Sequence, residues 1–569
     1  MINKKYTGRS ALVLGLCASL LIVLSLAVYG PLIKGNAQRA RGAKTPATRE
    51  RTRQDDRQKT KDEAPRGATA TTTTTPRISN DEKIERGAGA TELGEKIDRA
   101  IDESAFAAAR WGIYVSSLRD GRLIYARNAQ RPVTPASNMK VYTTAVALDL
   151  LGADYRWRTS VYAATEPDAQ GTINGDLFLY GRGDPELASD AKRGRSVATL
   201  GQLVEALYAR GVRRVRGSVV GDESYFRGEV LGDGWLWNDV QWYFGAEVSA
   251  LSINENETTL TVTPAAKAGD AVNIKFDTPT DYFKVDNDAN TRERGTPTSI
   301  GITRGLSDNE FRIWGDFPAG GRGFSARLAA HKPALWAAKL FREALQARGI
   351  SIEGEARMRD ARESLEARFD PQTAVELASV KSRTLGEVAR STNKESINLF
   401  AELILRTLGK ERGSMAEDKD PQRTRMRGDD EAGTAVLRLW LERAGISTQG
   451  LSLHDGSGLS RLDLVTPEAT ARLLAAISKT SAATVFRDSL PVAGRDGTLG
   501  GRLRSVAGRI QAKTGTLTYN NSLSGYALTE DGEPLVFSII CNNETAEGSS
   551  TRVIDEIARL LAASRQSSP

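Results

Sequence analysis

The sequence predicts an α/β protein in which both ends of the folded part share one sheet, with a β-rich insertion between them. Residues 111–128 (WGIYVSSLRDGRLIYARN) alternate on either side of Arg119-Asp120-Gly121, as a β-hairpin does. Residues 522–541 repeat this pattern around a Thr-Glu-Asp-Gly turn, and residues 549–564 have the apolar periodicity of a helix. We therefore expect two hairpins in one sheet that is backed by helices.

The first 88 residues are expected to lie outside this fold. Residues 11–33 form an uncharged apolar run, long enough to cross a bilayer as a helix, and Lys4, Lys5 and Arg9 precede it. We expect residues 1–33 to anchor the protein in the inner membrane, with the rest of the chain on the extracytoplasmic side of the cell envelope; a cleaved signal peptide is the alternative. Residues 34–88 are basic and threonine-rich, with few apolar side chains, which predicts a disordered linker.

The remaining sequence shows two kinds of hydrophobic pattern. Residues 161–379 consist of short alternating segments with Gly-Asp and Asn turns, which predict inserted β-rich domains. Residues 89–160 and 380–569 then form the domain that the insertion splits, and residues 384–409 within it have helical periodicity. Only Cys17 and Cys541 are present, so no disulfide is expected within the exported part.

Ser137 and Lys140 stand three residues apart where a loop gives way to a helix, in PASNMKVYTTAVALDLL. Residues at this spacing share one helix face, so the amine can reach the hydroxyl. A serine becomes a strong nucleophile when a base takes its proton, and a lysine is such a base only if burial or nearby positive charge lowers its pKa. Taken alone, the pair equally fits a helix N-cap serine with a surface lysine.

Two further motifs follow in the chain. Ser396 and Asn398 precede an apolar helical run, where a hydroxyl can relay protons and an amide can hold a substrate carbonyl. Lys513-Thr514-Gly515 falls on a predicted strand and offers a charge for a carboxylate, a hydroxyl donor and room for a substrate backbone. The backbone N–H groups of Ser137 and Thr516 are candidates for an oxyanion hole. Read singly, these motifs equally fit an N-cap and a hairpin edge protected by a lysine.

In this order, the three motifs resemble the Ser-x-x-Lys, Ser-Asp-Asn and Lys-Thr-Gly signature of penicillin-binding proteins and serine β-lactamases, with Ile397 in place of the Asp. The 256 positions from Lys140 to Ser396, and segments such as GDLFLYGRGDPEL and DGSGLSRLDLVTP, are similar to class C low-molecular-mass penicillin-binding proteins, the D-alanyl-D-alanine carboxypeptidase/endopeptidase family. The resemblance covers about residues 92–561. It implies a transpeptidase-like, β-lactamase-like catalytic domain with two nested β-rich domains inserted.

The resemblance also implies an activity and the residues that carry it. It implies hydrolysis, through an acyl-enzyme, of the terminal D-Ala-D-Ala bond of peptidoglycan stem peptides and of D-Ala to diaminopimelate cross-links, with β-lactams as covalent inhibitors and no cofactor. The implied roles are nucleophile for Ser137, base for Lys140, proton relay and amide anchor for Ser396 and Asn398, and carboxylate-binding strand for Lys513, Thr514 and Gly515. Asp239 and Arg461 resemble positions that bind the diaminopimelate side chain.

Two other functions stay open at this point. A β-lactamase needs a positioned carboxylate to hydrolyse the acyl-enzyme, and no motif offers one; a non-catalytic wall-binding scaffold would not need the three motifs. A Ser-His-Asp triad is disfavoured because only His331, in the insertion, and His454, expected in a turn, are present. Two histidines cannot form a three-histidine zinc site, and no phosphate loop, dinucleotide fingerprint or sign of nucleic-acid binding is found.

Overall fold

The computed structural model describes residues 83–87, 90–189, 197–361, 370–416 and 428–565. The expected anchor, and the expected linker up to residue 82, lie outside the described residues. None of the described helices is both long enough and apolar enough to cross a bilayer. The linker prediction was wrong at its end, because Ile84–Arg86 form strand β1, which pairs with the edge of the main sheet. All three side chains of β1 are exposed and its ladder is made by the backbone, so composition gave no sign of it.

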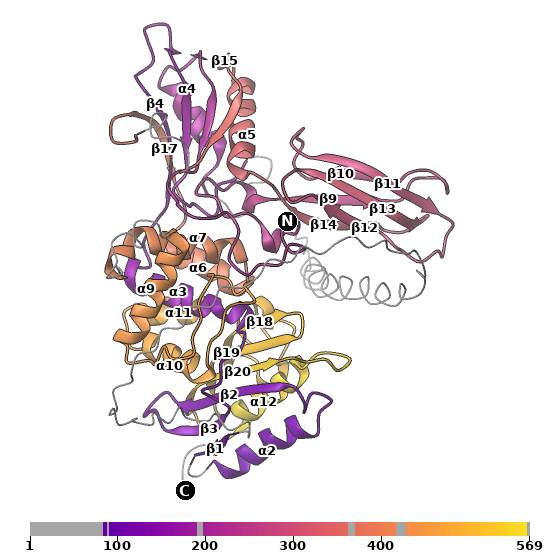
Figure 1. Ribbon diagram of the computed structural model, residues 1–569, viewed down its shortest axis with the longest axis vertical. Coiled ribbons are helices and arrows are strands. Elements are labelled where there is room, and N and C mark those ends of the chain that lie inside the picture. The colour runs from indigo at the N-terminus through magenta and orange to yellow at the C-terminus, as the bar shows by residue number, and fades with distance from the viewer. Residues whose placement is uncertain (1–82, 88–89, 190–196, 362–369, 417–427, 566–569) are drawn as a thin grey trace, which may run out of the picture. The chain divides into compact units, whose positions relative to one another are not determined.

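The main sheet joins the two ends of the folded chain, as predicted (Figure 1). Its order is β1-β3-β2-β20-β19-β18, and all neighbours are antiparallel. Both expected hairpins form, and β2 pairs with β20 so that Trp111 lies opposite Cys541. The strands are β2 Arg110–Ser117, β3 Leu123–Arg127, β18 Ile510–Leu517, β19 Asn520–Leu528 and β20 Pro534–Asn542.

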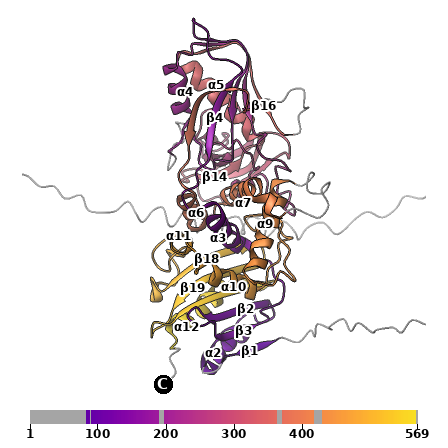
Figure 2. The ribbon, with the colours of Figure 1, turned by 90° about the vertical axis from the view of Figure 1, so that its left-hand side faces the viewer.

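Helices cover both faces of this sheet (Figures 1 and 2). One face packs against α2 (Thr91–Asp102) and the predicted terminal helix α12 (Thr551–Ala563). The other packs against a helical layer: α3 Met139–Leu151, α6 Leu385–Lys394, α7 Asn398–Arg412, α9 Asp429–Arg443, α10 Pro467–Ile477 and α11 Ala483–Ser489. Helix α3 is the centre of this layer, since every residue from Met139 to Leu148 is buried. A helix enclosed on all sides holds its N-terminus rigidly, which fixes the start of the site below.

The insertion begins in β4 and ends in β17, which pair with each other. They belong to a five-stranded sheet of order β16-β8-β6-β4-β17, and the predicted boundaries at 160/161 and 379/380 fall inside β4 and β17. Its strands are β4 Arg158–Ala163, β6 Leu177–Tyr180, β8 Val219–Asp222, β16 Ala356–Arg359 and β17 Val375–Lys381. A small sheet adds β5 Thr172–Ile173, β7 Arg214–Val215 and β15 Ser351–Ile352.

This part of the insertion also contains two helices that the alternating texture concealed, α4 (Leu200–Ala209) and α5 (Pro333–Ala347). In α5 the fully buried Trp336 and Phe341 belong to the same apolar core as strands β4, β6 and β8. Between β8 and α5 the chain forms two three-stranded sheets, which nest a second insertion within the first. They are β9 Glu257–Thr263, β10 Asn273–Phe276 and β14 Phe324–Ala329, and β11 Lys284–Arg292, β12 Gly301–Arg304 and β13 Glu310–Pro318.

Candidate active site

Ser137 lies in a short 3-10 helix, η1 (Ala136–Asn138), that leads directly into α3. Hydrogen bonds to strand β19 hold this turn in place. The Asn138 amide donates to Ser522 Oγ, and Ser522 Oγ donates to the Pro135 carbonyl at 2.7 Å. Helix α3 has no side-chain cap hydrogen bond at its start, so the alternative of an N-cap serine at Ser137 was wrong. The hydroxyl is half-buried and free of a capping role, as a nucleophile needs to be.

Lys140 is fully buried, one helical turn from Ser137, so the surface-lysine alternative was also wrong. Its Nζ contacts three oxygens: Ser137 Oγ at 3.0 Å, Asn398 Oδ1 at 2.6 Å and the Ser457 carbonyl at 2.8 Å. Burial lowers the pKa of Lys140 to about 7, while the buried carboxylates Asp455 and Glu402 oppose the shift. A neutral amine within hydrogen-bond reach of a serine hydroxyl is the arrangement that a general base requires.

The second and third motifs meet in front of this pair. Ser396 takes a left-handed backbone conformation (φ 61°) just before α7, and its Oγ accepts a hydrogen bond from Lys513 Nζ at 2.9 Å. Ile397, not Ser396, is the N-cap residue of α7, so the capping alternative was wrong here as well. Asn398 links both sides of the site, because its Oδ1 accepts from Lys140 and its Nδ2 donates to the Phe244 carbonyl at 2.8 Å.

Lys513 on β18 is fully buried, contrary to the alternative of an exposed protective lysine at a sheet edge. Burial, and the nearby Lys140, lower its pKa well below the usual value. A substrate carboxylate would oppose this shift, because it favours the ammonium form. Thr514 is buried beside Lys513, and its Oγ1 donates to Thr498 Oγ1 at 2.8 Å; Thr516 is exposed and bonds Asn521. Thr498 was not predicted, because it lies in a short helical turn far from the motifs in sequence.

Gly515 is required by packing as well as by room for a substrate. A side chain at this position would press on Ser522 Oγ and place its Cβ 2.8 Å from the Pro135 carbonyl. Both atoms belong to the clamp that holds the Ser137 turn against β18. The glycine therefore allows the strand and the nucleophile turn to lie in contact.

We expect Gly515→Ala to lower stability by about 1–3 kcal/mol through overpacking, and to slow acylation by a penicillin by roughly tenfold through displacement of the Ser137 turn. Thermal denaturation and stopped-flow acylation measure the two effects. Gly501→Ala is the matched control, since a Cβ there has nothing within 4 Å. Equal behaviour of the two variants would contradict the packing role of Gly515.

Asp239 and Arg461 lie near enough for their charges to interact, although 222 positions separate them. Burial raises the pKa of Asp239, and the charge of Arg461 partly opposes this rise. The Arg461 backbone N–H donates to the Gly234 carbonyl at 3.2 Å, and its Nη1 donates to Thr518 O at 3.1 Å, just beyond β18. The two side chains thus influence each other's charge, and Arg461 is held beside the end of β18.

Three buried carboxyl groups behind Lys140 were missed by sequence reasoning: Glu402, Asp455 and Asp463. Glu402 accepts from the backbone N–H groups of Gly456 and Ser457, at 3.1 Å and 2.8 Å. Asp455 accepts from Gly458, Ser460 and the Trp235 indole at 2.6, 2.7 and 2.9 Å. One signal was available, because Glu402 follows Asn398 by four residues and therefore shares its helix face.

A Ser-His-Asp arrangement, which the sequence disfavoured, is present at the surface. His454 Nε2 lies 2.9 Å from Ser452 Oγ, and His454 Nδ1 lies 2.9 Å from Asp233 Oδ2. The Asp233 side chain is 71% exposed, so water screens its charge and weakens its hold on the imidazole. In working triads this aspartate is buried, which argues against a second nucleophile at Ser452.

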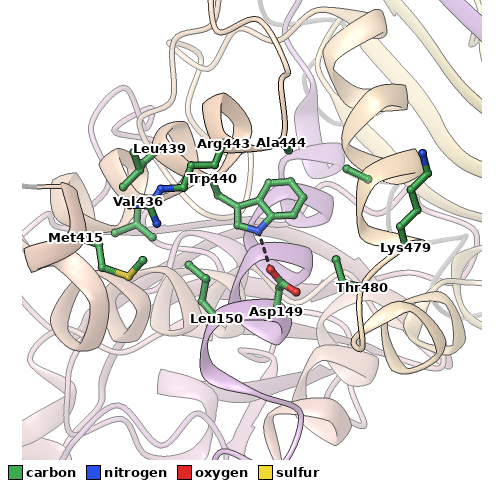
Figure 3. Close-up of a pocket in the computed structure, with 11 residues that line it drawn as sticks. Asp149, Leu150, Met415, Val436, Leu439, Trp440, Arg443, Ala444, Lys479 and Thr480 are labelled. Carbon is green, nitrogen blue, oxygen red and sulfur yellow. Dashed lines mark hydrogen bonds between the residues drawn. The ribbon is translucent and has the colours of Figure 1, made fainter.

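A separate pocket of about 470 Å³ lies at the opposite end of α3 (Figure 3). Trp440 and Asp149 face each other in it, joined by a hydrogen bond of 2.8 Å from the indole Nε1. Met415, Leu150 and Arg443 also line it. None of its lining residues belongs to the three motifs, so the chemistry described above lies elsewhere.

Comparison with known proteins assigns the chain to a family. Residues 93–564 match the model of the D-Ala-D-Ala carboxypeptidase 3 (S13) family. The chain belongs to this family. A D-alanyl-D-alanine carboxypeptidase from Actinomadura sp. (strain R39) is 34% identical over 489 residues, which cover 84% of this chain and 85% of that protein. The D-alanyl-D-alanine carboxypeptidase DacB of Haemophilus influenzae is 24% identical over 432 residues, 75% and 84% of the two chains.

Solved structures agree with the S13 assignment at the level of the fold. The crystal structure of penicillin binding protein 4 (dacB) from Haemophilus influenzae matches with a TM-score of 0.66 and 22% identity, covering 83% of this chain and 98% of that one. The same protein has been solved with a β-lactam, at a TM-score of 0.63. The predicted α/β fold class, the family resemblance and the serine D-Ala-D-Ala carboxypeptidase class are therefore confirmed.

Proposed function

We propose that this S13 chain cleaves the terminal D-Ala-D-Ala bond of peptidoglycan stem peptides, and D-Ala to diaminopimelate cross-links, through an acyl-enzyme on Ser137. The observation that carries the proposal is the buried Lys140 amine, 3.0 Å from Ser137 Oγ, with Ser396 and Lys513 joined beside it. β-Lactams acylate the same serine. Ser396 also has a buried amine beside it, Lys513, but we assign that amine to the substrate carboxylate.

Acylation follows from the contacts. Neutral Lys140 takes the Ser137 proton as Oγ attacks the carbonyl of the penultimate D-Ala, and the backbone N–H groups of Ser137 and Thr516 receive the oxyanion. Lys513 and Thr514 bind the terminal carboxylate. The Ser396 hydroxyl, held by Lys513, gives its proton to the departing amine and receives in exchange the proton that Lys140 took from Ser137, so Lys140 is neutral again. Water then hydrolyses the ester and restores Ser137.

The rate of acylation is expected to depend on the protonation of Lys140. Since burial lowers the pKa of this amine to about 7, the neutral, active form predominates above pH 7 and disappears as the pH falls. Acylation by a penicillin at pH 5 should therefore be about a hundredfold slower than at the alkaline plateau. Stopped-flow measurements from pH 5 to 9 test this, and a rate that stays flat between pH 5 and 8 would contradict it.

Asp239 and Arg461 supply the opposite charges that a diaminopimelate side chain, with its own amine and carboxylate, can pair with. This feature favours stem peptides that carry diaminopimelate at the third position. The intact pairing of motif residues speaks against a vestigial site in a scaffold protein. A β-lactamase would differ by rapid turnover of a chromogenic β-lactam, which we do not expect.

Product analysis tests the proposed activity. The purified domain from Lys83 onward is incubated with a stem pentapeptide and with cross-linked muropeptide dimers, and products are identified by mass spectrometry. Free D-alanine from the pentapeptide together with monomers from the dimers is expected. D-Alanine alone would restrict the activity to a carboxypeptidase. Neither product, despite labelling of Ser137 by penicillin, would favour the scaffold alternative.

We further propose that residues 1–33 tether the enzyme to the extracytoplasmic face of the inner membrane. The support is the uncharged apolar run at residues 11–33 and the basic residues that precede it. Full-length protein should remain in membranes washed with alkaline carbonate, whereas a chain lacking residues 1–33 should not. If the exported protein instead begins near Gly35, residues 1–33 belong to a cleaved signal peptide.

A further inference from the structure

Lys140 Nζ has three hydrogen-bond partners, and the number of hydrogen bonds that it can donate to them depends on its charge. A lysine ammonium carries three donors, which the three oxygens around Nζ can satisfy. The neutral amine has two N–H bonds and one lone pair. Asn398 Oδ1 and the Ser457 carbonyl can only accept, because the Asn398 Nδ2 group is committed to Phe244 O. They therefore take both N–H bonds, and the lone pair is left facing Ser137 Oγ.

The direction of the lone pair thus depends on the Ser457 carbonyl staying where it is. This carbonyl belongs to the loop of residues 455–460, which is not part of a helix or strand. Glu402, from α7, accepts from the Gly456 N–H at 3.1 Å and from the Ser457 N–H at 2.8 Å. It is 2% exposed, so these bonds are not exchanged with water.

Resting on the proposed function, we propose that Glu402 is a positioning residue. Glu402 accepts hydrogen bonds from the backbone N–H groups of Gly456 and Ser457, and so fixes the Ser457 carbonyl beside Lys140 Nζ. This contact orients the lone pair of the neutral amine toward Ser137. Glu402 touches neither the substrate nor the nucleophile. It acts through one peptide segment, on the amine that removes the proton.

The charges around the pair define a second readout. Glu402 and Asp455 face Lys140 and stabilise its ammonium form, whereas Lys513 opposes Lys140 from β18. Asp455 and Arg406 are the charged groups that influence Glu402, and Asp463 lies beside Asp455. Burial and Asp455 raise the pKa of Glu402, while its bonds from Ser457 and Gly456 and the charge of Arg406 lower it. Because the pKa of Glu402 is itself raised to about 8, its carboxyl is largely protonated where Lys140 titrates. A role through charge would move the titration of Lys140, whereas a role through position would change the rate and leave the titration in place.

The test compares the rate of acylation by a fluorescent penicillin in Glu402→Gln and in the wild type from pH 5 to 9. Each rate is divided by the number of molecules that the penicillin can label, so that misfolded protein does not count. A glutamine can keep the Oε1 acceptor of both N–H groups, but its Nε2 donor replaces the oxygen that also accepts from Gly456 and there opposes the Gly456 N–H. We expect the plateau rate to fall ten- to a hundredfold, since small misplacement of a base is costly. We expect the acidic limb of the profile to stay near pH 7, because Glu402 is largely protonated there in the wild type as well. Glu431→Gln, an exposed glutamate on the adjoining helix α9, is the matched control and should leave both unchanged.

The possible results separate the two proposals. A wild type that no penicillin labels at Ser137 would refute the proposed function itself. A labelled wild type with a Glu402→Gln variant of equal plateau rate overturns the positioning role alone, and so does a variant that only melts earlier or only moves the acidic limb. If Glu402→Gln does not fold, Glu402→Asp replaces it. There the acidic limb should again stay near that of the wild type while the shorter side chain slows the plateau at least tenfold, and a wild-type rate would overturn the inference.

Discussion

Replacing Ser137 with alanine is expected to reduce peptide hydrolysis by about 10⁴-fold or more, the largest effect of any single substitution in this chain. The substitution removes the atom that forms the acyl-enzyme, while the turn that carries it is held by Asn138, Ser522 and Pro135 and should keep its shape. Release of D-alanine from a stem pentapeptide measures the loss. Thermal denaturation should show an unchanged fold.

Ser452→Ala is the informative control for this experiment. Ser452 is the serine of the surface Ser-His-Asp chain, so its hydroxyl has a hydrogen-bonded imidazole beside it. We expect this variant to retain wild-type hydrolysis. Loss of activity in Ser452→Ala with activity retained in Ser137→Ala would move the nucleophile to the other site.

Replacing Lys140 with methionine is expected to lower the rate of acylation about 10³-fold, within the range of general-base contributions. Methionine fills nearly the same buried space but offers no lone pair to Ser137, and it leaves Asn398 Oδ1 and the Ser457 carbonyl without their donor. Stopped-flow acylation by a penicillin measures the change. Lys479→Met, at an exposed lysine beyond α10, should have no effect.

Lys140→Arg distinguishes a base from a positive charge. A guanidinium keeps the charge but does not lose a proton at these pH values. If Lys140 acts as the base, the arginine variant should be nearly as slow as the methionine variant. An arginine variant with close to wild-type acylation would show that charge alone suffices and would contradict the role of base.

The residues that we propose as catalytic were predictable because they lie in short motifs of local spacing. Ser137 and Lys140 lie one turn apart, and the contexts of Ser396 and Lys513, before a helix and on a strand, followed from local patterns. The shared sheet was also predictable, since each hairpin has its own alternation and turn. The order of the motifs can be read from the sequence, whereas the nesting of the inserted domains came from the family resemblance, since periodicity alone did not give it.

The residues that were missed depend on contacts that span the chain. Glu402 looks like an ordinary helical glutamate until the fold brings the loop of residues 455–460 against it. Thr498 becomes relevant only because it meets Thr514. Helix α5 was concealed because the alternating segments around it dominated the pattern, and β1 because its ladder involves only backbone atoms. Each depends on tertiary contacts, which one sequence does not report.

The most direct test of the central claim is to locate the acyl group. The wild-type domain is acylated with penicillin, digested with trypsin and mapped by mass spectrometry, which separates residues 128–140, with Ser137, from 395–406, with Ser396, and from 444–461, with Ser452. We predict one penicilloyl adduct, on Ser137, and no adduct in Ser137→Ala. An adduct on Ser396 or Ser452, or labelling that persists in Ser137→Ala, would contradict an acyl-enzyme at the start of α3.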